Sequence, residues 1–142
     1  MESALLGVVL DSSVLIGAER KRLTTPEVIR SIRQAIGDVP IVISALTVAE
    51  LGHGIYRADT PQRAVQRRQF LEELKAHIPI HPLTATTAEI VARIGGEQAA
   101  NGVNLPPADL IIGACAIELG YAIATNNLRD FGRIPGLVAM QI

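Results

Sequence analysis

LLGVVLDSS, residues 5–13, is the stretch that decides the fold. Its first six residues form a short, continuous run of apolar residues and glycine, which is typical of a fully buried strand in a parallel sheet. Asp11 ends the run, and the two serines after it begin a short helix predicted for residues 12–18. The carboxylate of Asp11 therefore has two interpretations: it caps that helix, or the fold directs it toward a positive ligand.

Strands and helices alternate along the rest of the chain. After the strand at residues 5–10 we expect strands at residues 41–44, 78–82, 121–125 and 137–142, and helices at residues 25–36, 45–58, 61–75, 84–100 and 107–119. Ser44 is the predicted N-cap of the second of these helices. The alternation favours an α/β fold with a mostly parallel central sheet and helices on both of its faces.

Length and composition indicate one domain, residues 1–142, because domains usually have about 100–200 residues. Cys115 is the one cysteine, which excludes an internal disulfide and a thiolate zinc cluster and favours a small buried side chain in a reducing compartment. The N-terminus carries Glu2 and no basic residue, so it is a poor signal peptide, and no apolar stretch reaches the roughly 18 residues of a membrane span. We expect a soluble, cytoplasmic protein.

The net charge is −1, from 13 basic and 14 acidic residues, and by itself it argues against a nucleic-acid partner. The distribution of the charges along the chain is more informative than their sum. The segment from Arg20 to Arg68 contains nine basic residues and four acidic ones. If a metal neutralised four carboxylates, the balance would become 13 − 10 = +3, which tolerates a polyanion. Solvated helix faces with ordinary salt bridges are the alternative interpretation of the basic segment.

Four carboxylates are predicted to gather at one edge of the sheet, because open parallel sheets bind ligands beyond the carboxyl ends of their strands. Asp11 ends the first strand, Glu50 lies in the helix after the second strand, and Asp109 lies in the first turn of a later helix. Asp130 lies just past the strand at residues 121–125. Each has an ordinary alternative, since Asp11 and Asp109 could charge helix starts. Glu50 could pair with a buried arginine, and Asp130 could lie in an exposed turn.

A hard divalent cation would remove the repulsion within such a cluster, where a like-charge pair at about 4 Å costs on the order of 4 kcal/mol at an effective dielectric near 20. The ligand set holds no thiolate and no convincing histidine, which favours Mg²⁺ or Mn²⁺ over zinc. His53 could face the same pocket, whereas His77 and His81 look structural. Two such ions about 3.5–4 Å apart activate water and steady a leaving oxygen, and this chemistry cuts phosphodiester bonds.

Four segments in order carry a resemblance to a known family: VLDSSVL at residues 9–15, ISALTVAEL at 43–51, PPADLIIGACAIELGYAIATNNLRDF at 106–131 and IPGL at 134–137. Together they resemble a PIN-domain ribonuclease of the VapC toxin type, over essentially the whole chain. The resemblance implies a PIN-like three-layer α/β/α sandwich and a Mg²⁺- or Mn²⁺-dependent endoribonuclease. It also implies a dimer and a small antitoxin protein that inhibits the enzyme.

The resemblance also implies roles for seven residues. The metal-binding and catalytic carboxylates are Asp11, Glu50, Asp109 and Asp130, of which Asp130 is the most variable in the family. The polar residues that support or line the site are Ser13, Thr125 and Asn127. Short hydroxyls beside carboxylates suit an outer shell that orients metal ligands, although turn and helix capping is the alternative.

RNA binding is predicted for Arg20, Lys21 and Arg22, which follow the first short helix and could reach the mouth of the site. The low aromatic content, 3%, favours recognition of RNA shape and backbone over the reading of splayed bases. The aliphatic residues of 45–55 exceed what one inward helix face needs, so we expect a second copy or the antitoxin to cover part of them.

Two other functions remain as alternatives to the nuclease. A Mg²⁺-binding phosphoacceptor signalling domain is also a parallel α/β fold, but it needs paired acids near the first strand and a lysine after a later strand, and the lysines here are Lys21 and Lys75. A non-catalytic subunit that binds RNA or an antitoxin would keep the fold but has no need of the carboxylates. The RNA target, the cleavage position, the number of metal ions and the antitoxin lie outside what the side chains indicate.

Overall fold

Five short strands form one parallel sheet in the computed structural model, which describes residues 5–142. They are β1 (Val8–Leu10), β2 (Ile41–Ser44), β3 (Ile80–His81), β4 (Ala122–Thr125) and β5 (Ala139–Gln141). Their order across the sheet is β3-β2-β1-β4-β5, and every neighbouring pair is parallel. β1 lies at the centre, so its carboxyl end is flanked by the carboxyl ends of β2 and β4.

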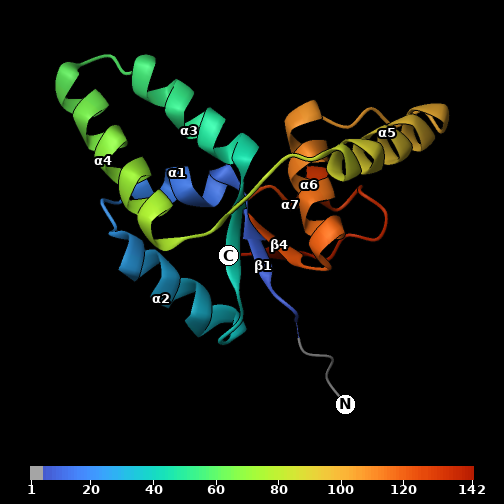
Figure 1. Cartoon of the computed structure of the whole chain (residues 1–142), viewed down its shortest axis with the longest axis horizontal. Helices are drawn as coiled ribbons and strands as arrows, with labels where there is room; N and C mark the ends of the chain where they lie inside the picture. Colours follow the sequence, from blue (N-terminus) through green and yellow to red (C-terminus); the bar gives the residue numbers. More distant parts are fainter. Residues whose placement is uncertain (1–4) are drawn as a thin grey trace.

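Seven helices join these strands within the described residues. They are α1 (Ser12–Arg20), α2 (Thr25–Ile36), α3 (Ala45–Tyr56), α4 (Pro61–His77), α5 (Ala85–Ala100), α6 (Pro107–Leu119) and α7 (Leu128–Phe131). Figure 1 shows α1 to α4 on one side of the sheet and α5 to α7 on the other. The predicted three-layer α/β/α arrangement is confirmed, whereas the short α7 was not anticipated.

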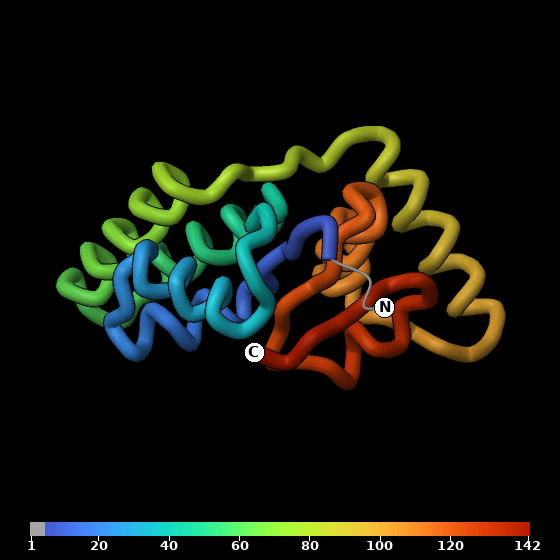
Figure 2. Tube along the Cα trace, turned by 90° about the horizontal axis from the view of Figure 1, so that it is seen from below, coloured from blue at the N-terminus to red at the C-terminus, as the bar shows by residue number. Residues whose placement is uncertain are grey.

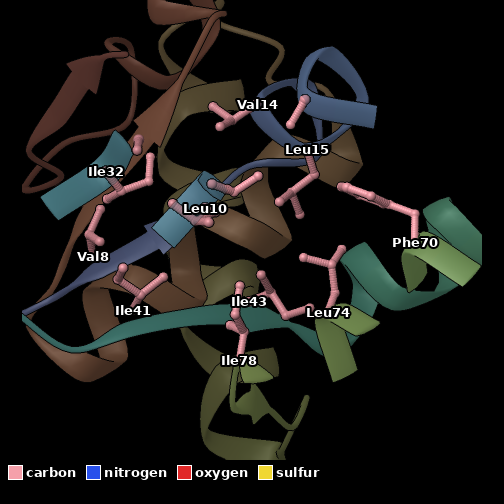
Figure 3. Packing of buried hydrophobic residues seen from close by; sticks show 13 residues of the cluster. Val8, Leu10, Val14, Leu15, Ile32, Ile41, Ile43, Phe70, Leu74 and Ile78 are labelled. Carbon is pink, nitrogen blue, oxygen red and sulfur yellow. The ribbon is translucent and has the colours of Figure 1, made fainter. Parts of the chain in front are cut away.

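The sheet is buried on both faces, as its apolar strands require. Val8 and Leu10 pack with α1, α2 and α4 in the cluster drawn in Figure 3, and Val9 packs with α6 on the opposite face. All three side chains have 0% exposure. Because burial of such a side chain is worth about 1.5–3 kcal/mol, the two clusters hold β1 in place from both sides.

Local sequence signals set the helix boundaries. Thr24 and Glu27 form a reciprocal capping box at the start of α2, with Pro26 in its first turn. The Ser44 hydroxyl accepts a hydrogen bond from the Leu46 amide at 3.1 Å, which confirms it as the N-cap of α3. Gly120 ends α6 with a φ of 71°, a left-handed conformation that glycine adopts without a steric cost.

α3 and α4 form a helical hairpin, which we call the α3–α4 arm. Figure 1 shows the two helices joined at their outer end, away from the sheet, and Figure 2 shows α5 at the opposite end of the molecule. At the centre of the arm Gly52 faces Leu71 of α4, and a Cβ at this position would make an ordinary van der Waals contact with Leu71 Cδ2 at 3.9 Å. Nearer the outer end, Arg67 Nη1 donates to the carbonyl oxygen of Gly54 at 2.6 Å. This hydrogen bond ties α3 to α4 near the outer end of the arm.

Outside the candidate site, a polar cluster joins β3, α5 and α6. Glu118 accepts hydrogen bonds from the Thr87 hydroxyl at 2.5 Å and the Thr84 hydroxyl at 3.4 Å, and it pairs with His81 Nε2 at 3.1 Å. These contacts lower the pKa of Glu118, the Thr87 hydrogen bond contributing most. His81 is thus structural, as predicted.

Two further predictions concern single residues and the membrane. Cys115 is 1% exposed, and burial raises the pKa of its thiol to about 12, so it is the buried apolar side chain that its neighbours indicated.

Glu2, on which the expectation about a signal peptide rests, lies outside the described residues. None of the helices in residues 5–142 combines the length and the apolar character that crossing a membrane demands.

Candidate active site

Asp11 lies at the carboxyl end of β1, where the strand turns into α1. Its amide donates to the carbonyl oxygen of Ala124 at 2.9 Å, which extends the β1–β4 pairing by one residue. Its side chain makes no capping hydrogen bond to α1, although the residue occupies the N-cap position. The helix-capping interpretation of this carboxylate is therefore wrong.

Two hydroxyl groups hold the Asp11 carboxylate instead. Ser13 Oγ donates to Asp11 Oδ2 at 2.6 Å, and Thr125 Oγ1 donates to the same oxygen at 2.9 Å. Asp11 is only 4% exposed and Thr125 is fully buried. Hydrogen bonds to a charged group inside a protein are stronger than those between neutral groups, so these two contacts fix the orientation of the carboxylate.

The loop after β4 orients both hydroxyls. The Asn127 amide donates to Thr125 Oγ1 at 2.8 Å, and the Asn126 amide donates to Ser13 Oγ at 3.1 Å. Since each hydroxyl oxygen accepts from the backbone, its own hydrogen is free to point at Asp11. The part played by Asn126 was not predicted, because it acts mainly through its backbone.

Asn127 also orients the fourth predicted carboxylate. Its side-chain Nδ2 donates to Asp130 Oδ2 at 2.9 Å. Asp130 lies in the first turn of α7, half-buried, in a short helix and not in the exposed turn that was its alternative. The segment from Thr125 to Asp130 thus presents three polar side chains to the same edge of the sheet.

Glu50 projects from the middle of α3 and is half-buried. Its Oε1 atom is buried and has no hydrogen-bond partner in the described part of the chain. Burial raises the pKa of this carboxyl, and the nearby Asp11 raises it further, while the Ser12 hydroxyl opposes the rise. A buried carboxylate oxygen without a partner is costly, so Glu50 is suited to a cation that the protein alone does not supply.

Asp109 lies in the first turn of α6, beside Pro107 and half-buried. Burial, followed by the negative charges of Asp11, Asp130 and Glu50 in that order, raises the pKa of its carboxyl to about 6. Each of the other three carboxylates therefore lies close enough to repel the charge of Asp109. The structure brings together the four residues that we call the carboxylate cluster: Asp11, Glu50, Asp109 and Asp130.

The carboxylate cluster has the donor set of a hard divalent cation. Its four side chains all end in carboxylate oxygens, which Mg²⁺ and Mn²⁺ prefer as ligands. The site lacks positive charge in two respects. A buried oxygen of Glu50 has no hydrogen-bond partner, and the charges of the neighbouring carboxylates repel that of Asp109. Across residues 5–142, however, no three His, Cys, Asp or Glu side chains already stand in a metal-chelating group. The residue types of the carboxylate cluster therefore suit a metal ion. In the structure, however, their side chains are not close enough together to chelate one.

The predicted RNA-binding residues lie away from the carboxylate cluster. Arg20, Lys21 and Arg22 are exposed at the far end of α1, about 13 Å along the helix axis from Asp11. His53 lies one turn beyond Glu50 on α3 and is exposed. None of these four side chains makes a hydrogen bond or ion pair with the carboxylate cluster in the described structure.

Comparison with known proteins identifies a family whose model matches this chain. A family model for the PIN domain matches residues 8–137. Ribonuclease VapC1 of Rickettsia felis is 27% identical over 96% of this chain and 97% of its own length. The tRNA(fMet)-specific endonuclease VapC of Shigella flexneri is 32% identical over 67% of this chain and 70% of its own length.

Solved structures show the same fold. The VapBC complex of Salmonella typhimurium bound to DNA contains a chain with a TM-score of 0.80 and 27% identity, covering 96% of this chain and 98% of that chain. VapBC2 of Rickettsia felis, bound to a promoter DNA fragment, has a TM-score of 0.82 at 21% identity with the same coverage. The sequence family and the three-layer fold therefore agree over nearly all of the described residues.

Proposed function

The chain belongs to the PIN domain family, and from that premise we propose that it is a VapC-type endoribonuclease toxin that hydrolyses phosphodiester bonds of RNA. The observation that carries the proposal is the carboxylate cluster, in which Asp11 is oriented by Ser13 and Thr125. The names of the relatives, ribonuclease and tRNA(fMet)-specific endonuclease, support RNA as the substrate. Because cellular RNA is the proposed substrate, we expect the enzyme to act in the cytoplasm.

The proposed cofactor is Mg²⁺ or Mn²⁺, held by Asp11, Glu50, Asp109 and Asp130. When bound to oxygen ligands, such ions lower the pKa of water and offset the negative charge that develops on a phosphate during hydrolysis. Asp130 is the weakest of the four proposed ligands, since its carboxylate also accepts a hydrogen bond from Asn127.

The side chains of this protein have separate tasks in the proposal. Ser13 and Thr125 keep Asp11 in one orientation, so no rotation of that carboxylate has to be frozen when RNA binds. In the metal-free protein, burial and the charges of Asp11, Asp130 and Glu50 together raise the pKa of Asp109 to about 6, and a cation held at this carboxylate would favour its ionised form. Arg20, Lys21 and Arg22 are proposed to attract the RNA backbone from the exposed end of α1.

A protein antitoxin and a second copy of the chain are the proposed partners. Two solved relatives support the antitoxin: a member of the VapBC family of toxin-antitoxin systems from Mycobacterium tuberculosis and a toxin-antitoxin complex from Klebsiella pneumoniae. The partly exposed apolar side chains of α3, such as Leu46 and Leu51, support coverage of this helix by another protein. The PIN family match over residues 8–137 argues against the phosphoacceptor alternative.

One experiment tests the proposal and the non-catalytic alternative together. Purified, antitoxin-free protein is incubated with total cellular RNA in Mg²⁺ or in EDTA, beside the variants Asp11→Asn and Asp109→Asn. Glu97→Gln, which removes an exposed carboxylate of α5, is the matched control. We expect metal-dependent cleavage by the wild-type protein and the control and at least about a hundredfold loss in the two variants, because each removes a ligand of the ion.

Two results would contradict the proposal. Persistent metal-dependent cleavage by both Asp variants would show that the carboxylate cluster does not hold the catalytic ion. A wild-type protein that binds RNA and never cleaves it would favour the non-catalytic subunit.

A further inference from the structure

Tyr56, the last residue of α3, is the most exposed of the large apolar and aromatic side chains in residues 5–142, at 80%. The chain has few aromatic residues, two Tyr and two Phe, and Phe70 and Phe131 are buried. A single exposed apolar residue is ordinary on a protein surface. The meaning of Tyr56 therefore depends on what surrounds it.

Arg68 of α4 stacks on the ring of Tyr56. The guanidinium carbon lies 5.6 Å from the ring centroid, within the range of a cation–π contact, and Arg68 Nη2 donates to the Tyr56 hydroxyl at 3.4 Å. The arginine supports the ring from one side and leaves most of the ring surface in solvent, as the 80% exposure requires. The pair forms a flat aromatic surface with a positive charge behind it.

The backbone beneath the pair is fixed. Tyr56 belongs to a helix, and the hydrogen bond from Arg67 to the Gly54 carbonyl oxygen ties the last turn of α3 to α4. A binding surface that is already ordered loses little conformational entropy when a ligand lands on it.

The surroundings are strongly basic. Residues 56–68 contain four arginines and one acid, a balance of 4 − 1 = +3. The acid, Asp59, pairs with Arg63 at 3.3 Å on the surface, which leaves the charge of Arg57 free to meet another anion. Arginine charge attracts a phosphate backbone, and exposed aromatic rings stack unpaired bases.

Tyr56 and the carboxylate cluster lie on different faces of α3. Tyr56 comes six residues after Glu50, which is about 9 Å along the helix axis and about 120° around it. Its ring therefore lies on the face that meets Arg68 of α4, whereas Glu50 lies beside Asp11. An RNA strand that reaches both sites has to pass around the helix.

We infer that Tyr56, backed by Arg68, is a stacking platform for an unpaired base of the RNA substrate. The inference rests on the proposed ribonuclease function and names a substrate-binding contact for it. It modifies the expectation that low aromatic content favours recognition of RNA shape and backbone over the reading of splayed bases, because one exposed ring can stack one base.

The test measures RNA binding without cleavage. The probe is a fluorescein-labelled, single-stranded RNA of uridines and adenosines, and its affinity is measured by fluorescence anisotropy in EDTA for the wild-type protein, Tyr56→Leu and Tyr56→Phe. Val65→Ala is the control, because Val65 is another exposed apolar residue of the same arm, 55% exposed. A second probe has the same backbone with its bases removed.

We expect Tyr56→Leu to weaken binding of the base-bearing probe about 5- to 100-fold, and Tyr56→Phe to stay within about twofold, because a phenyl ring keeps the stacking face. Val65→Ala should bind like the wild-type protein. The probe without bases should not distinguish Tyr56→Leu from the wild-type protein. Circular dichroism melts of each variant check that the fold is intact.

Three results would overturn the platform: no binding of either probe by the wild-type protein, equal affinity of Tyr56→Leu and the wild-type protein, or equal weakening for both probes. Equal affinity would assign this surface to a protein partner. The proposed function fails separately. If the protein binds RNA through Tyr56 but never cleaves it in Mg²⁺, the stacking platform is supported and the nuclease function is refuted. If it cleaves RNA equally well without Tyr56, the nuclease function is supported and the platform is refuted.

Discussion

Asp109→Asn should stabilise the metal-free protein at neutral pH while it abolishes cleavage. Asp109 is half-buried in the carboxylate cluster, and burial together with the neighbouring charges raises its pKa from 3.8 to about 6. Two pKa units correspond to about 3 kcal/mol. Because the side chain is partly open to solvent, we reduce this to about 1–2 kcal/mol. Asparagine has nearly the same shape and carries no charge, so it removes this penalty.

The pH dependence follows from the direction of the shift. As the pH rises above about 4, the unfolded chain releases the proton of Asp109 first, because its pKa there is the ordinary one. The folded chain keeps the proton until about pH 6, so the free energy of unfolding falls between these two values. Above pH 6 this loss is complete. The advantage of Asp109→Asn over the wild-type protein should therefore grow from pH 4 to pH 7 and then level off.

Urea unfolding followed by circular dichroism, in EDTA at a series of pH values, measures this difference. Glu97→Gln is the control and should follow the wild-type protein at every pH. Addition of Mg²⁺ should reverse the order, because an ion at 100 times its Kd stabilises the wild-type protein by about 2.7 kcal/mol and the variant by less. A difference that does not change with pH would refute the crowding of charges at Asp109, and with it the electrostatic argument for a cation site.

Three smaller predictions concern other parts of the structure. Thr125→Val should lower the free energy of unfolding by about 2–4 kcal/mol in urea titrations, since it removes a hydrogen bond to Asp11 and leaves the Asn127 amide without its acceptor; a loss below about 0.5 kcal/mol would show that the contact is dispensable. Glu118→Gln should destabilise the protein at pH 7 and much less at pH 4, because the lowered pKa of Glu118 gives stability that is lost as the pH falls; equal melting temperatures at pH 7 would contradict this. Cys115 should react with a thiol reagent only after unfolding, because its thiol is buried with a pKa of about 12, and rapid reaction in native buffer would disprove that burial.

The sheet was predictable from the sequence because buried strands have a distinctive pattern. IVIS at residues 41–44 became β2 residue for residue, and the central strand ended at Leu10 as expected. The strand expected at residues 78–82 is only two residues long in the structure, β3, since the prolines on both sides have no amide hydrogen to donate to a sheet. Apolar pattern therefore located the strands better than it located their ends.

The candidate site was predictable only in part. The order of the strands placed Asp11 and Thr125 at one edge, but the sequence left open whether Asp11 caps a helix. That choice depends on a hydrogen bond between residues 114 positions apart, which no local pattern contains. The backbone contacts of Asn126 depend on the path of a loop, and the stacking of Arg68 on Tyr56 depends on how two helices pack. Local signals do not encode either arrangement.

The long separation between Asp11 and its partner hydroxyl also has a consequence during protein synthesis. β1 leaves the ribosome well before Thr125, and it cannot pair with β4 until β4 has emerged. Because synthesis proceeds from the N-terminus, the nascent polypeptide carries an incomplete acidic centre until then. A ribosome making this protein is thus exposed to a complete acidic centre only after β4 has left it.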